Sequence, residues 1–165
     1  MWRTHSDLIT TIRRAATLAL ETCGEEMGDR HQRHAASVLL SGDGRLKELN
    51  AVFRNKPKPT NVLSFPAVPA LFPYIGDVAL AYGVLRDESA AQNKSLAAHA
   101  AHLTIHGILH LLGYQHDRPK EAKAMENLEI LLLGQLGIAD PYMPTPVRRR
   151  AKQPKLTVCP RVPAR

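Results

Sequence analysis

The sequence predicts an α+β domain in which a small mixed β-sheet packs with about five α-helices. Three short segments of strand-like composition lie before residue 81, and two long segments with helical spacing of apolar residues follow residue 95. Strands and helices therefore do not alternate regularly, as they would in an α/β fold. A chain of 165 residues suits one domain with a substantial core and is short for two. We expect that domain to span residues 1–142.

The first helix is expected to begin at Ser6, which can cap a helix N-terminus, and to end near Gly24. Its apolar stripe consists of Leu8, Ile12, Ala15, Ala16 and Ala19. Residues 36–41 have the composition of a buried strand, and the Gly-Asp-Gly run at residues 42–44 predicts a turn after it. Residues 45–53 then return to helical spacing.

Two further strands are expected at residues 60–66 and 75–80, which are β-branched and apolar and are separated by a proline-containing loop. The Ala- and Leu-rich pattern from Leu96 to Gly113 predicts a long helix. Pro119 opens the last helix, because proline is favoured in a first helical turn. The buried face of that helix is expected to contain Ala122, Met125, Leu128 and Leu132.

The net charge of +7 comes entirely from the C-terminal end of the chain. Residues 141–165 contain seven of the 22 Lys and Arg residues and no acid, so the preceding 140 residues carry 15 basic and 15 acidic side chains. The same end holds six of the twelve prolines. This is the composition of a solvated, disordered arm, so residues 143–165 are expected to form a basic, proline-rich tail outside the domain.

The cysteine and apolar patterns bear on the compartment of the protein. Cys23 and Cys159 are too few and too far apart in sequence to predict a disulfide framework. No apolar run is long enough to span a membrane, and the N-terminus lacks the uninterrupted apolar segment of a signal peptide. These features predict a cytoplasmic protein that does not act at a membrane.

The strongest functional signal is a group of three histidines in residues 97–116. His106 and His110 are one helical turn apart, so both imidazoles leave the same face of a helix. Gly113 can end that helix in a left-handed conformation, and the returning chain can bring His116 to the same point. Three nitrogen ligands leave a position open for water, as in a catalytic zinc site, whereas structural sites are usually closed by four protein ligands. We expect one Zn²⁺ ion at these three histidines.

Other histidines lie on the same stripe, and the alternative explanation is a chance alignment. Two histidines four residues apart on an apolar helix are more often a coincidence than a ligand pair, and the third histidine is what favours metal binding. His99 and His102 extend the stripe by two earlier turns. We expect structural or supporting roles for them, although the spacing excludes neither as a ligand.

Three sequence blocks occur in a specific order and separation. They are His106-Gly107-x-x-His110-x5-His116, the segment Pro59-Thr60-Asn61-Val62-Leu63-Ser64-Phe65-Pro66 preceded by Leu49-Asn50 and Arg54, and Ile75-Gly76-Asp77. Through these blocks the chain resembles the YbeY family of bacterial rRNA-maturation proteins over residues 36–142.

The resemblance implies a single-strand-specific, metal-dependent endoribonuclease whose zinc ion is held by the three histidines. It implies single-stranded RNA and rRNA as substrates and ribosomal subunits as partners, because the family takes part in processing the 3′ end of small-subunit rRNA and in ribosome quality control. In that family, the arginine that matches Arg54 is implicated in activity.

The loop that begins at Arg54 is basic, which suits this chemistry. Residues 45–58 contain five basic side chains and one acid. A guanidinium can grip two phosphate oxygens at once, so Arg54 is the candidate for stabilising charge on a phosphodiester. Lys56 and Lys58 would then hold neighbouring phosphates without reading sequence. By charge alone, a solvated basic loop without a function explains the pattern equally well.

Three features depart from the family pattern. Gln115 stands where the family usually has an aspartate, which removes a negative charge beside a ligand. Family members usually have a strand before the first helix, whereas this chain begins almost at that helix, so we expect either a late start or a missing sheet edge. The tail of residues 143–165 lies beyond the pattern, and it would either contact RNA electrostatically or have no role.

Two other functions fit parts of the sequence. Metzincin-like zinc peptidases share the histidine and glycine spacing, but their general base is a glutamate at the position of Gly107, and glycine has no proton acceptor. A non-catalytic ribosome assembly factor with a structural zinc ion would leave RNA intact. An aromatic content of 5% without a stacking motif gives no support for base-specific readout.

Overall fold

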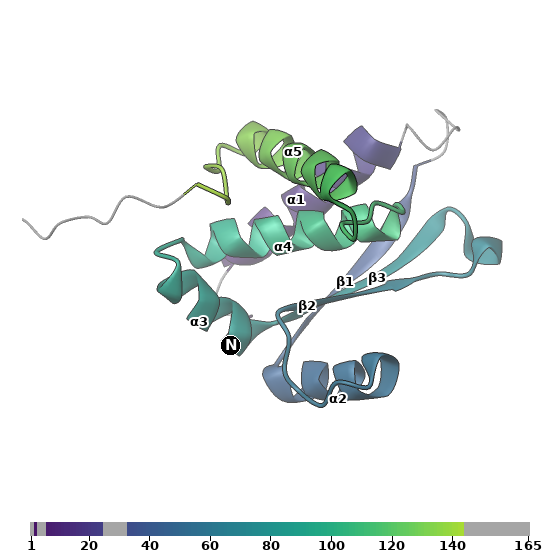
Figure 1. Ribbon diagram of the computed structural model, residues 1–165, viewed down its shortest axis with the longest axis horizontal. Coiled ribbons are helices and arrows are strands. Elements are labelled where there is room, and N and C mark those ends of the chain that lie inside the picture. Colours follow the sequence, from purple (N-terminus) through teal and green to yellow (C-terminus); the bar gives the residue numbers. More distant parts are fainter. Residues whose placement is uncertain (1, 3–5, 25–32, 144–165) are drawn as a thin grey trace, which may run out of the picture.

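The computed structural model describes residues 2, 6–24 and 33–143, and the expected tail therefore lies outside the described residues except for Met143. The described residues form five α-helices, a three-stranded sheet and one short 3₁₀ helix, which confirms the α+β class (Figure 1). The elements in chain order are α1 (Ser6–Gly24), β1 (Ala35–Ser41), α2 (Asp43–Arg54), β2 (Val62–Pro66), η3 (Pro69–Leu71), β3 (Tyr74–Ala81), α3 (Tyr82–Ala91), α4 (Leu96–Leu111) and α5 (Pro119–Gln135).

The sheet is mixed, as predicted, and β3 lies at its centre. Val38 of β1 lies opposite Val78 in a parallel pairing, and Ser64 of β2 lies opposite the same residue in an antiparallel pairing. Successive side chains of a strand point to opposite faces, so this register gives each face of the sheet its own set of residues. The two faces are covered by different helices (Figure 1).

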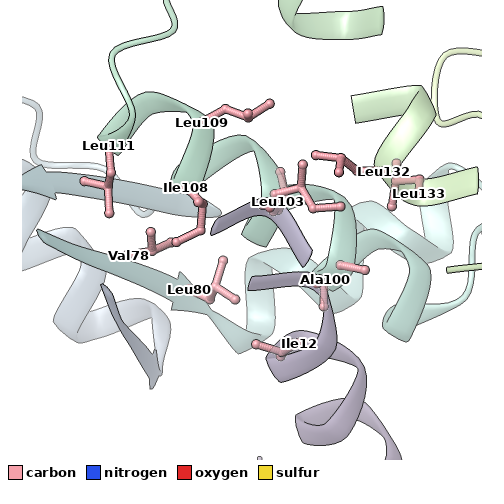
Figure 2. Packing of buried hydrophobic residues seen from close by; sticks show 14 of the residues in the cluster. Ile12, Val78, Leu80, Ala100, Leu103, Ile108, Leu109, Leu111, Leu132 and Leu133 are labelled. Carbon is pink, nitrogen blue, oxygen red and sulfur yellow. The ribbon is translucent and has the colours of Figure 1, made fainter. Parts of the chain in front are cut away.

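The main core lies on the face of the sheet that α4 covers. The helix α4 contacts β2 and β3 on one side and α1, α3 and α5 on the others, which makes it the most buried helix. Figure 2 shows Val78 and Leu80 of β3 beside Ile108 of α4, with Leu132 and Leu133 of α5 on the far side of the helix. Burial of these apolar side chains is the main stabilising contribution, and it fixes the position of α4 on the sheet.

The opposite face of the sheet is covered by α2 (Figure 1), and Val84 of α3 packs against the same side. A smaller apolar cluster forms there from Leu46 of α2 and from Leu63, Ala79 and Ala81 of the two neighbouring strands. The helix starts earlier than predicted, because Asp43 belongs to α2 and not to the preceding turn. Arg54 ends the helix, and Asn55 leaves it in a left-handed conformation with φ of 54°.

The helix α3 is the α-helix for which the sequence predicted no residue range. Its first turn is capped from a distance, because Oδ1 of Asp43 accepts hydrogen bonds from the backbone amides of Gly83 and Val84 at 2.8 and 3.2 Å. Asp43 lies forty residues before Gly83, so no local capping signal marks the start of α3. The carboxylate therefore links the first turn of α2 to the first turn of α3.

The helix lengths bear on the membrane prediction. In the described part of the chain, no helix is both long and apolar enough to cross a lipid bilayer.

Candidate metal centre and adjoining cleft

The three predicted histidines meet at the C-terminal end of α4. After Leu111 the chain makes a Schellman turn, in which Tyr114 N donates to Leu109 O and Gly113 N donates to His110 O, both at 3.0 Å. The turn uses Gly113 with φ of 90°, as predicted, and reverses the chain. One nitrogen each from His106, His110 and His116 then lie within 4.8 Å of one another. This cluster can hold a metal ion.

The hydrogen bonds of His106 and His110 place a proton on Nδ1 of each ring. Nε2 of each ring can therefore bind a metal ion. Nδ1 of His110 lies 3.0 Å from the carbonyl oxygen of Tyr114, which can only accept, so this nitrogen carries the proton. Nδ1 of His106 lies 2.8 Å from the carboxylate of Glu129 and donates to it for the same reason. Burial, and next the neighbouring His106, lower the pKa of His110, which favours the neutral form that a metal ligand needs.

The two remaining nitrogens face each other in a way that suits a bound cation. Nε2 of His106 and Nε2 of His110 are 3.1 Å apart, and each presents a lone pair once the proton is on Nδ1. Two lone pairs at this distance repel unless a positive charge lies between them. In a tetrahedral site with Zn–N distances of about 2.0–2.1 Å, ligand nitrogens lie about 3.3 Å apart. The spacing therefore fits a metal ion of that size.

Glu129 of α5 is a site residue that the sequence analysis missed. It is 1% exposed, and it accepts hydrogen bonds from His102, His106 and the hydroxyl of Tyr142. Burial by itself raises the pKa of Glu129, but these three donors lower it to about 2, so the group is a carboxylate. A carboxylate behind a ligand histidine fixes the orientation of the imidazole and increases its basicity. The sequence contained one signal for Glu129: this acidic residue lies on the same apolar stripe of the helix as Met125 and Leu132.

His102 and His99 lie along the stripe without joining the metal cluster of the described residues. Nε2 of His102 lies 2.9 Å from Glu129, so His102 supports the carboxylate that supports His106. His99 lies 2.8 Å from Glu88 of α3, and burial lowers its pKa. Glu88 also accepts from the side chain of Asn61, in the loop before β2. Both histidines therefore connect α4 to neighbouring elements.

Gly107 brings α4 close to the sheet. A Cβ atom at this position would lie 2.7 Å from Cγ1 of Val78 and 3.1 Å from Oγ of Ser64. The hydroxyl of Ser64 also donates to the Gly107 carbonyl at 3.1 Å. Position 107 therefore faces the packing between α4 and β3, and any side chain there would have to displace these neighbours.

A cleft of about 420 Å³ opens beside the histidines and contains Arg54. It is lined by Arg54, Thr60, Asn61, Val62, Ser64, Pro66, His106, His110, Gln115 and His116. The cleft thus runs around the β2 edge of the sheet, between the end of α2 and the end of α4. Two of the three blocks that carry the family resemblance meet in it.

The loop after Arg54 is held in place by Asn50 of α2. Nδ2 of Asn50, a buried side chain, donates to the carbonyl of Lys58 at 2.8 Å, and the Asn50 carbonyl accepts from Lys56 N. Lys56 and Lys58 themselves are exposed and do not line the cleft. The structure therefore places Arg54 with the histidines and leaves the two lysines outside the cleft.

A family model described as Endoribonuclease YbeY matches residues 3–137 of the chain. A protein of Nitrobacter winogradskyi named Endoribonuclease YbeY is 40% identical over 151 residues, which cover 87% of this chain and 77% of that protein. A protein of the same name from Francisella tularensis subsp. novicida is 45% identical over 130 residues, which cover 73% of this chain and 80% of that protein.

The fold also matches a solved structure. The solution structure of a Thermotoga maritima protein aligns with a TM-score of 0.53 and 23% sequence identity, covering 84% of this chain and 93% of that protein. At this identity the match shows a shared fold and nothing further.

Proposed function

The chain belongs to the YbeY family of endoribonucleases, and we propose that it cuts single-stranded RNA with the help of one zinc ion held by His106, His110 and His116. The observation that carries this proposal is the cleft in which the three histidines and Arg54 lie together. By family, the substrate would include the 3′ end of small-subunit rRNA, with ribosomal subunits as partners. Such a substrate would place the protein in the cytoplasm.

The residues of the cleft divide the work on a phosphodiester between them. His106, His110 and His116 would hold the zinc ion, which would supply a coordinated water with a pKa of about 7 and polarise a phosphoryl oxygen. Arg54 would bind two phosphate oxygens and stabilise the charge that builds on them in the transition state. The Schellman turn holds His110 through Tyr114, and Glu129 holds His106, so the two imidazoles keep their orientation while substrate enters. Lys56 and Lys58 would bind phosphates outside the cleft.

The proposal is tested by offering the metal-loaded protein a single-stranded RNA, a duplex of the same sequence, and casein. We expect cleavage of the single strand alone, and loss of that cleavage in the presence of a chelator. Intact RNA with a loaded metal site would contradict the proposal and favour a structural metal ion. Cleavage of casein would favour a peptidase.

Arg54→Ala should lower kcat/KM for single-stranded RNA by about 10²-fold, the usual loss when one group that stabilises transition-state charge is removed. Metal content should stay unchanged, because Arg54 is not a ligand. Arg54→Lys should recover only part of the activity, since an ammonium cannot bind two oxygens in a fork. Steady-state kinetics of the three proteins on one oligonucleotide measure this.

The matched control for Arg54→Ala is Arg45→Ala on the same helix. Arg45 pairs with Glu48 at 3.0 Å on the exposed surface and does not line the cleft. Its loss should leave kcat/KM within about twofold, since an exposed ion pair contributes little. Equal losses in the two variants would mean that Arg54 acts only through general surface charge.

Glu129→Gln should weaken zinc binding by about 10- to 100-fold, the range found when the outer partner of a ligand histidine is removed. The amide cannot accept from three donors as a carboxylate does, so His106 loses its fixed orientation. Competition with a chromophoric chelator measures the affinity directly. Glu121→Gln, on an exposed face of the same helix, is the control. Unchanged affinity in Glu129→Gln would show that Glu129 only fills the core.

A further inference from the structure

A second cavity lies beside the metal centre, on its α5 side. It has a volume of about 230 Å³, and its lining includes His106, His116, Met125, Glu126, Glu129 and Tyr142. The cavity shares His106 and His116 with the cleft that contains Arg54. A strand of RNA whose phosphate lies at the histidines could therefore place an adjacent group in this second cavity.

Tyr142 offers this cavity an aromatic ring that is held at two points. Its hydroxyl donates to Glu129, and its ring contacts the ring of His102 at a centroid distance of 5.6 Å and an angle of 80°. The residue nevertheless remains 47% exposed. A ring that is fixed at its hydroxyl and one side, and that lines a cavity, is a platform on which a nucleobase can stack.

Glu126 supplies the polar group that could read such a base. Its side chain is 39% exposed, and its ion pair with Lys123 is long, at 3.8 Å, so its carboxylate remains available to a ligand. Glu129 is not available, because His102, His106 and Tyr142 already donate to it. A carboxylate accepts from the exocyclic amino group of a base, whereas it repels a phosphate. The cavity is thus suited to a base and unsuited to the backbone.

We propose that this cavity is a nucleobase subsite, in which Tyr142 stacks on the base next to the scissile phosphate and Glu126 accepts a hydrogen bond from its amino group. Cytosine, adenine and guanine carry such a group and uracil does not, so the subsite favours an amino-bearing base over uracil. The inference rests on the proposed function and adds a base preference that the sequence did not indicate. Met125, which is 2% exposed, contributes an apolar wall.

The test uses oligouridine substrates that carry a single cytosine at successive positions. For the wild-type protein loaded with zinc, kcat/KM should rise at least about fivefold when the cytosine occupies one position next to the cut, the lower end of what one good base contact provides. Glu126→Gln should bring that ratio close to one, because an amide can also donate to the uracil carbonyl. Glu121→Gln should keep the ratio, since Glu121 lies outside the cavity.

Two variants of Tyr142 separate stacking from support of the metal centre. Tyr142→Phe keeps the ring and loses the hydrogen bond to Glu129, so the preference for cytosine should persist. Tyr142→Leu keeps an apolar side chain of similar reach but loses the aromatic face, so kcat/KM should fall below that of Tyr142→Phe on all substrates, because stacking holds any base. Equal rates on all substrates by the wild type, an unchanged ratio in Glu126→Gln, or equal kcat/KM in Tyr142→Leu and Tyr142→Phe would overturn the proposal.

A binding measurement keeps the subsite testable if the wild type cuts no RNA. Cytidine monophosphate, added to the zinc-loaded protein, should shift the backbone amide resonances of residues 125, 126 and 142 at lower concentration than uridine monophosphate does. Absence of cleavage with this difference in binding would refute the proposed function and retain the subsite. Cleavage of RNA without this difference in binding would support the proposed function and refute the subsite.

Discussion

His110→Ala is expected to reduce cleavage of single-stranded RNA by at least about 100-fold and to abolish one-to-one zinc binding. The estimate is a lower limit, because removal of an outer partner of a ligand already costs about 10- to 100-fold in affinity or activity. His110 is a stronger test than His116, since it lies on α4 with Nδ1 fixed by the Tyr114 carbonyl and Nε2 facing His106. Metal analysis of the purified protein and single-turnover kinetics measure the two effects.

The control for His110→Ala is His34→Ala, which removes a histidine that packs against Phe72 far from the cluster in sequence. It should keep both the zinc ion and the activity. A chelator added to wild-type protein should reproduce the activity of His110→Ala. If His110→Ala retained zinc in a one-to-one ratio, the three histidines would not be the ligand set.

Gly107→Ala should lower the free energy of unfolding by about 1–3 kcal/mol, which is the usual cost of forcing an extra methyl group into a packed core. For a domain of this size the melting temperature should fall by roughly 3–10 °C. The reason is geometric, because the new Cβ would lie 2.7 Å from Cγ1 of Val78 in the central strand. Thermal unfolding followed by circular dichroism measures the change. Gly107→Glu should cost more.

The matched control is Gly134→Ala in α5, where an added Cβ would meet nothing within 4 Å. Alanine is favoured over glycine inside a helix by up to about 1 kcal/mol, so this variant should be stabilised or unchanged. A loss of stability in both variants would mean that helix propensity and packing do not explain the role of Gly107. A loss of stability in Gly107→Ala together with a gain in Gly134→Ala would show that Gly107 allows α4 to approach the sheet.

Position 107 also bears on the choice between nuclease and peptidase chemistry. A peptidase of the metzincin type needs a glutamate there as general base. In this fold a side chain at the position would meet Val78 of β3 at 2.7 Å and Ser64 of β2 at 3.1 Å, so there is no room for a glutamate without displacing them. The missing carboxylate therefore has a packing explanation as well as a chemical one.

Much of the fold follows from local sequence patterns. The strand predicted at residues 36–41 is β1, and the strand predicted at residues 75–80 is β3, each extended by one or two residues. β3 is buried from Val78 to Ala81, whereas β1, which was predicted to be a buried strand, lies at the sheet edge and its residues alternate between exposed and half-buried. α3 could not be placed, because its only fully buried residues are Leu85 and Ser89 and its cap is the distant Asp43.

The residues of the candidate site also divide into those that local sequence patterns predict and those that they do not. His106, His110 and His116 were predictable, because helical spacing and a glycine stop are local features of the chain. Arg54 needed the family resemblance, since nothing in a basic loop shows that it lies against α4. Glu129 and Tyr142 reach the site through the packing of α5 and the segment after it, and sequence separation hides such contacts.

The three histidines of the proposed metal centre differ in how firmly the fold holds them, and this has a kinetic consequence. His106 and His110 belong to α4, which cannot move without disrupting the core, whereas His116 is exposed and follows the Gly113 turn. Segments of this kind open locally at far lower free energy than core helices do. Exchange of the ion with chelators in solution should therefore proceed through release of His116 while the domain stays folded. Its rate should depend on that turn and be insensitive to denaturant at concentrations below those that unfold the core.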